Sequence, residues 1–160
     1  MRKRIFWLIL SERKFIMICF IVYVLFLFYI TLFAWNHGAS LGDEGPGGRN
    51  YNLVPGLSIY RIAVFSPTYI DPLIILLGNV LLFFPLGFFM THLFKIKWPL
   101  LFVTILGFFV SLFIEVNQFL FTQRVANVDD LILNTLGAFL GALFALTCRF
   151  FNKWGQNKKA

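Results

Sequence analysis

Few polar side chains interrupt the long apolar stretches of this sequence, and three of them lie at similar distances from a stretch end. Asn79, Glu115 and Asn134 each stand about six or seven residues inside an apolar stretch. At about 1.5 Å of rise per residue, helices would bury all three roughly 10 Å below one face of a membrane. Amide and carboxyl groups are costly there unless they face the protein interior or a wet cavity. Their common depth therefore predicts an interior polar pocket.

Residue spacing indicates which neighbours share this pocket. Ser111, Glu115 and Gln118 are separated by four and then three residues, which places them on one helix face, whereas Asn117 points elsewhere. The last apolar stretch has a comparable face, which carries Asp130, Asn134, Gly137 and Gly141. The pocket is expected to lie between these faces and to open outward.

Small residues in the last stretch predict close helix packing. Gly137, Gly141 and Ala145 repeat every four residues, and the first two form a GxxxG motif. A surface of this kind lets another helix approach closely, either inside the chain or in a second copy. A homodimer through Gly137 and Gly141 is therefore one expectation.

One carboxyl and one guanidinium group could give the pocket its chemistry. Glu115 could act as a general acid or base, and Arg124, in the link above it, could bind a phosphate or carboxylate. The structural alternative is that Glu115 is protonated and hydrogen-bonded to Asn79 or Asn134, joining helices, while Arg124 is a solvated loop charge. The predicted pocket contains no histidine and no nucleophile beside a base, which counts against an enzyme.

The elements that position these residues are predicted to be membrane-spanning helices. Of the 160 residues, 59% are hydrophobic and 13% are charged, a balance outside the range of soluble domains. Roughly 20 apolar residues in a helix cross a membrane. Such stretches cover residues 15–35, 72–94, 98–121 and 128–148. The sequence therefore predicts an all-α membrane protein, a four-helix bundle formed by a single domain of residues 1–160.

Basic residues indicate how the bundle is oriented. If the N-terminus is cytoplasmic, three basic residues face outward, namely Arg49, Arg61 and Arg124. Eleven then face the cytoplasm, namely Arg2, Lys3, Arg4, Arg13, Lys14, Lys95, Lys97, Arg149, Lys153, Lys158 and Lys159. This asymmetry predicts that both termini are cytoplasmic. Anionic lipid head groups at the basic ends explain the net charge of +7, so no nucleic acid is expected as a partner.

The one long connection, residues 36–71, is predicted to be extracellular. Its Gly-rich part, residues 38–48, is expected to be mobile, and the apolar and aromatic residues 52–69 are expected to lie in the outer interface. A cleavable signal peptide, cut near residues 38–40, is the alternative explanation of the first apolar stretch. That stretch is longer than a signal peptide requires.

Two helix starts can be placed from capping signals. Asp71 is an expected N-cap for the second helix, with Pro72 at the first helical position. Asn127 is an expected N-cap for the fourth helix, with Asp130 three residues later, as in a capping box.

Cysteine and histidine residues give no sign of a metal site. Cys19, Cys148, His37 and His92 are scattered along the chain, whereas metal ligands cluster. No metal and no cofactor are expected.

Four segments of the chain together resemble a known family. They are Asn52-Leu53-x-Pro55, then Gly78-Asn79-Val80-Leu81-Leu82-Phe83-Phe84-Pro85-Leu86-Gly87, then Ser111-x-x-x-Glu115-x-x-Gln118, then Arg124 with Asp129-Asp130-Leu131-Ile132-Leu133-Asn134-Thr135-Leu136-Gly137. Over roughly residues 52–145 the chain resembles the VanZ-like family of bacterial membrane proteins. An acid is more usual in that family where Asn127 stands.

The resemblance implies a place in the plasma membrane of Gram-positive-type bacteria. The founding member of the family is linked to low-level resistance to teicoplanin, a lipoglycopeptide antibiotic, and the family has no established reaction. Six positions carry over to this sequence, namely Asn79, Glu115, Gln118, Arg124, Asp130 and Asn134.

Two functions remain open from the sequence. The preferred one is an envelope protein that binds a lipid-linked or amphiphilic ligand in the outer leaflet, such as a cell-wall precursor or a lipoglycopeptide. The alternative is an enzyme acting on a lipid head group, with Glu115 as general acid or base. A transporter would need a dimer, because four spans without an internal repeat form no pathway.

The predicted orientation can be tested with single cysteines in a variant lacking Cys19 and Cys148. Cysteines at Gly47 and Gln123 should react with a membrane-impermeant thiol reagent in intact cells, because both would face outward. A cysteine at Lys158 should react only after lysis. Labelling at position 158 in intact cells would reverse the orientation.

Overall fold

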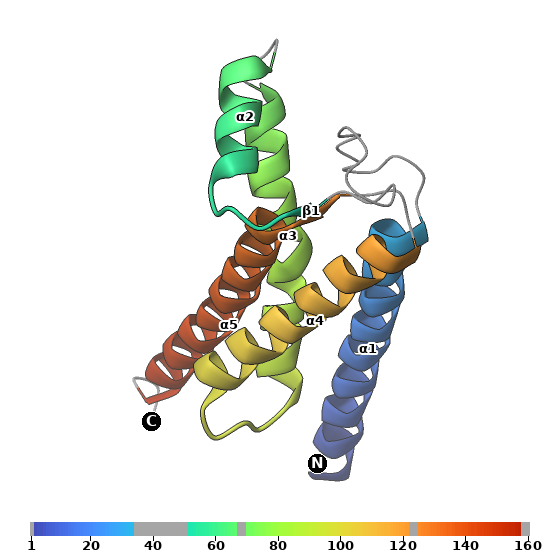
Figure 1. Cartoon of the computed structure of the whole chain (residues 1–160). Helices are drawn as coiled ribbons and strands as arrows, with labels where there is room; N and C mark the ends of the chain where they lie inside the picture. Colours follow the sequence, from blue (N-terminus) through green and yellow to red (C-terminus); the bar gives the residue numbers. More distant parts are fainter. Residues whose placement is uncertain (1, 34–50, 67–69, 122–124, 158–160) are drawn as a thin grey trace.

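The computed structural model describes residues 2–33, 51–66, 70–121 and 125–157, most of which are helical (Figure 1). The helices are α1 (Arg2–Phe28), the π-helix η1 (Tyr29–Phe33), α2 (Leu57–Phe65), α3 (Ile70–Leu93), α4 (Pro99–Phe121) and α5 (Val128–Asn157). Two short strands, β1 (Tyr51–Asn52) and β2 (Ala126–Asn127), pair in parallel.

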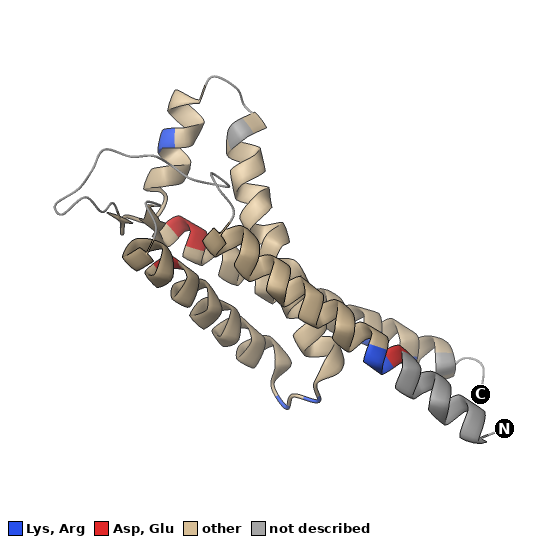
Figure 2. Cartoon of the chain, turned by 90° about the vertical axis from the view of Figure 1, so that its right-hand side faces the viewer, with Lys and Arg blue, Asp and Glu red and all other residues tan. Residues whose placement is uncertain are grey.

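Four helical segments are long and apolar enough to cross a membrane, as the sequence predicts. They are Glu12–Phe33, Pro72–Leu93, Pro99–Phe121 and Val128–Gly155. The prediction of an all-α membrane bundle is confirmed. The chain begins and ends at the same end of the bundle, as an even number of spans requires (Figures 1 and 2).

The centre of the bundle is a close contact between α3 and α5. A Cβ atom at Gly137 would lie 2.2 Å from the carbonyl oxygen of Val80, and one at Gly141 would lie 1.9 Å from that of Phe84. A Cβ atom at Gly87 on α3 would likewise clash with the backbone of Ala138 on α5. Because no side chain separates the two helices, their backbones touch. The GxxxG surface is thus used inside the chain, and the homodimer stays a prediction.

The other two spans pack around this pair. Gly107 on α4 lies against Ala138 on α5. The hydroxyl of Tyr23 on α1 donates to the carbonyl of Leu82 on α3, at 2.7 Å. Phe83 and Leu27 are completely buried where α1 meets α3. Packing of large side chains therefore holds α1, whereas small residues bring α3, α4 and α5 together.

Basic side chains close the C-terminal end of α3. Arg149 donates hydrogen bonds to the carbonyl groups of Thr91 and His92, and Arg13 donates to that of Leu93. The last carbonyls of a helix lack partners within the helix and carry partial negative charge, so cations stabilise them.

The connection between the first two spans differs from expectation in two ways. It contains a helix, α2, beside the start of α3, and a strand, β1, whose partner is β2 just before α5 (Figure 1). The prediction that Asp71 caps the next helix is wrong, because α3 begins at Ile70 and Asp71 falls in its first turn. The Gly-rich residues 38–48 lie outside the described part.

The contact between α3 and α5 can be tested by adding one methyl group. Gly141→Ala should lower stability by about 1–3 kcal/mol, because overpacking forces the two backbones apart. Gly155→Ala, on the same helix with nothing within 4 Å of the new Cβ, should be neutral or stabilising. Melting temperatures in detergent would check this. Equal melting temperatures for both variants would contradict the close contact.

Candidate functional site

The start of α5 is built around the side chain of Asn127. Its Oδ1 accepts a hydrogen bond from the backbone N–H of Asp129, at 3.1 Å, which is the N-cap arrangement. The N-cap role predicted for Asn127 is therefore confirmed. Its Nδ2 also donates to Asp130, at 3.2 Å.

Glu115 on α4 completes the cap of α5. Its Oε2 accepts from the backbone N–H of Asn127 at 2.7 Å, and the side chain is buried. In a capping box the acid three residues after the N-cap makes this bond. Here Glu115 makes it, and Asp130 instead accepts from the amide of Asn79 on α3, at 2.9 Å. Three helices thus meet at the N-cap of α5.

Asp129 caps a different helix from the one in which it stands. Its Oδ1 accepts from the N–H of Gly56 at 2.5 Å, and its Oδ2 accepts from those of Ser58 at 3.0 Å and Ile59 at 3.3 Å. Gly56, the N-cap residue of α2, has no side chain to serve this role, and its φ of 80° favours glycine. The carboxylate is only 2% exposed. Asp129 therefore attaches α2 to α5.

Asn52 adds an amide network beside this attachment. Its Nδ2 donates to Ser58 Oγ at 2.8 Å and to Asn127 Oδ1 at 3.1 Å. The strand pairing places Asn52 directly beside Asn127. Sequence reasoning did not select Asn52, Ser58 or Asp129 for the site. The sequence signal that could have indicated this contact is the Pro55-Gly56 turn. A helix whose N-cap is glycine has no capping side chain of its own, so its first N–H groups need an acceptor from elsewhere in the chain.

The remaining predicted residues lie in separate contacts. Asn134 Nδ2 donates to Ser111 Oγ at 2.9 Å, joining α5 to α4, and both side chains are buried. Gln118 Nε2 donates to the carbonyl of Thr31 in η1, at 2.8 Å. Arg124 lies outside the described residues. The predicted residues that the structure describes thus take part in contacts between several helices.

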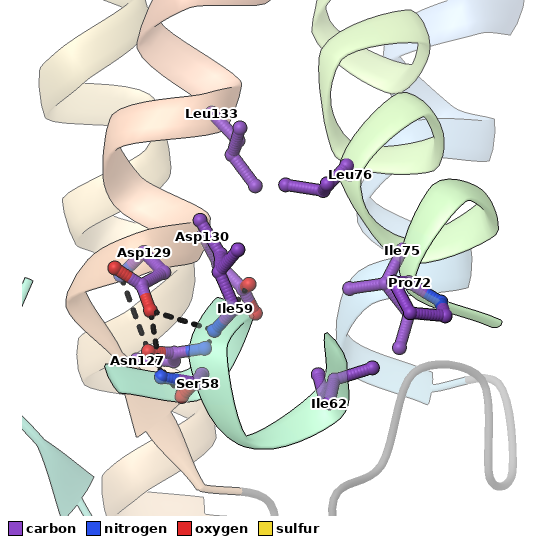
Figure 3. Close-up of a pocket in the computed structure, with 10 residues that line it drawn as sticks. All are labelled: Ser58, Ile59, Ile62, Pro72, Ile75, Leu76, Asn127, Asp129, Asp130 and Leu133. Atoms are coloured by element: carbon purple, nitrogen blue, oxygen red, sulfur yellow. Dashed lines mark hydrogen bonds between the residues drawn. The ribbon is translucent and has the colours of Figure 1, made fainter. Parts of the chain in front are cut away.

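A crevice lies where α2, α3 and α5 begin, next to these contacts (Figure 3). Its polar side contains Ser58, Asn127, Asp129 and Asp130. Its apolar side contains Ile59, Ile62, Pro72, Ile75, Leu76 and Leu133. Of the residues predicted for the pocket, Asp130 lines this crevice, and Asn79 and Glu115 support its polar side through their hydrogen bonds.

The family model described as VanZ/LLP1 matches residues 20–150, which include the crevice, the second and third spans and most of the first and fourth. The chain belongs to the VanZ/LLP1 family. No curated protein and no solved structure matches it.

In this VanZ/LLP1 protein, the amide of Asn127 has a role that a carboxylate could not fully perform. Either side chain offers an oxygen to the N–H of Asp129, so the cap would remain. Only the amide also donates to Asp130. Asn127 thus avoids a third carboxylate beside Asp129 and Asp130.

The described residues contain no cluster of three or more His, Cys, Asp or Glu side chains that could hold a metal ion. The polar side of the crevice in this VanZ/LLP1 protein is formed by Ser58, Asn127, Asp129 and Asp130, which offer hydrogen bonds and negative charge. Its apolar side offers contact with hydrocarbon.

The attachment of α2 can be tested with two neighbouring variants that remove the same charge. Asp129→Asn replaces one acceptor oxygen by an amino group facing backbone N–H donors, at a cost of about 1–3 kcal/mol. Hydrogen–deuterium exchange at Ser58 and Ile59 should accelerate. Asp130→Asn keeps an oxygen for Asn79 and Asn127, so exchange in α2 should stay slow. Similar exchange in both variants would refute the attachment.

Proposed function

We propose that this protein binds a lipid-linked or other amphiphilic ligand in the crevice between α2, α3 and α5, and thereby contributes to glycopeptide (teicoplanin) resistance. The proposal depends on one observation, the division of the crevice into an apolar and a polar side. An amphiphile also has an apolar part and a polar part. Its tail could contact the apolar side of the crevice while its head group contacts the polar side.

The apolar side could lie against part of an acyl or prenyl chain at the surface of the bundle. Ile59 and Ile62 come from α2, Ile75 and Leu76 from α3, and Leu133 from α5, so three helices contribute to one hydrocarbon surface. Inside the membrane a hydrocarbon tail gains little free energy from contact with apolar side chains, because lipid tails are equally apolar. Membrane lipid competes for the same surface, so specificity has to come from the polar side.

We place the crevice in the outer leaflet of a bacterial plasma membrane, with both termini in the cytoplasm. Asp129 and Asp130 lie in the first turn of α5, and Figure 2 shows acidic residues at the end of the bundle away from the termini. Arg13 and Arg149 lie at the other end, where they donate to the last carbonyl groups of α3. Positive charge is retained on the cytoplasmic side of membrane proteins, which supports this orientation.

A catalytic role for Glu115 receives less support than ligand binding. Glu115 accepts from the backbone of Asn127 and does not line the crevice. A general acid or base has to come within hydrogen-bond distance of its substrate. We therefore assign Glu115 to holding the crevice in shape, and binding remains the favoured function.

Filling the crevice should abolish this function. Leu76→Trp would place an indole among the apolar residues of the crevice, whereas Leu77→Trp changes an adjacent residue that is 56% exposed. Mass spectrometry of lipids that copurify with each variant should show a specific species lost only in Leu76→Trp. Teicoplanin susceptibility of cells expressing each variant should change in parallel. Retention of both lipid and phenotype by a well-folded Leu76→Trp variant would refute the proposal.

A further inference from the structure

Several hydrogen-bond donors on the polar side of the crevice already have acceptors within the chain. The backbone N–H groups of Ser58 and Ile59 donate to Asp129. The hydroxyl of Ser58 donates to Asn127 Oδ1, and the side-chain amide of Asn127 donates to Asp130. An incoming acceptor, such as a phosphate oxygen, would compete with these internal acceptors for the same donors.

One hydrogen-bond acceptor on the polar side of the crevice, an oxygen of Asp130, has no donor among the described residues. Asp130 Oδ1 receives hydrogen bonds from Asn79 and Asn127, whereas Oδ2 receives none from the described residues. Asp130 lines the crevice and is partly buried. A carboxylate in this position is stabilised by a donor, and most strongly by a cationic one.

The described residues supply no cation for this carboxylate. Among the described residues no lysine or arginine lines the crevice, and Arg61, the basic residue of α2, lies along an open hollow with Phe65 and Ser66. Asp129 stands next to Asp130, so the polar side carries two carboxylates without an ion pair among the described residues. A partly buried negative charge without a counter-charge is costly, and a cationic ligand would remove that cost.

We infer that the crevice selects amphiphiles whose head group is a protonated amine, bound at Asp130 Oδ2 with the hydrocarbon tail along Ile75, Leu76 and Leu133. This inference rests on the proposed function and names the head group that the crevice would accept. An anionic head group would be repelled by the two neighbouring carboxylates. A neutral hydroxyl could donate to Asp130 but would leave its charge uncompensated.

Three probes of equal chain length separate these cases: dodecylamine, dodecanol and dodecanoate, each carrying a diazirine at the same carbon. The protein would be reconstituted in nanodiscs, irradiated with each probe and digested, and crosslinked peptides from α2, α3 and α5 would be quantified. The amine should label the crevice more than the alcohol, and the carboxylate least. Asp130→Asn should reduce labelling by the amine about tenfold, because a charge-assisted hydrogen bond is lost.

The controls separate a local site from general electrostatics. Glu12→Gln removes one negative charge from an exposed position near the other end of the bundle, so the preference for the amine should be unchanged. Asp130→Asn keeps an oxygen for Asn79 and Asn127, so its melting temperature should stay near that of the native chain.

The outcomes also separate this inference from the proposed function. Equal labelling by amine and alcohol, or an amine preference that survives Asp130→Asn, would overturn the head-group assignment while crevice labelling still supported amphiphile binding. Labelling by no probe, or labelling that Leu76→Trp leaves unchanged, would overturn the proposed function itself. Loss of the amine preference in Asp130→Asn alone would support both.

Discussion

The backbone N–H groups at the start of a helix need acceptors, and the hydrocarbon of a membrane supplies none. Both α2 and α5 meet this need with carboxylates from other parts of the chain. Asp129 serves the first N–H groups of α2, and Glu115 serves the backbone N–H of Asn127 before α5. These two side chains join α2, α4 and α5 at one place. The walls of the crevice keep their positions because these bonds are made.

The features that sequence reasoning predicts correctly depend on local properties of the chain. Four spans follow from runs of apolar residues, since a helix in a membrane must be apolar over its whole length. The cap at Asn127 follows from residues within the first turn of one helix. The small residues of α5 do face another helix closely, although their pattern did not say which helix that would be.

The partners of the polar side chains could not be predicted in the same way. Spacing along a helix indicates depth and face, but it does not indicate the angle at which two helices cross. Equal depth suggested that Glu115 would meet Asn79 or Asn134, whereas the structure pairs them with Asn127, Asp130 and Ser111 respectively. The partner of Asp129 was harder still to predict from the sequence. An acid in the first turn of α5 is already explained by its favourable interaction with the dipole of α5, so nothing indicated a contact with α2.

The cap that Asp129 provides for α2 also has a consequence for biogenesis. Ser58 is made early and Asp129 is made 71 residues later, so a ribosome has delivered most of the chain before α2 receives its acceptor. Until then the N–H groups at the start of α2 remain without it. The last helix to be synthesised, α5, therefore supplies the N-terminal cap of α2, a helix that left the ribosome long before it. A nascent chain halted before Asp129 would contain every residue of α2 but not the means of holding its first turn.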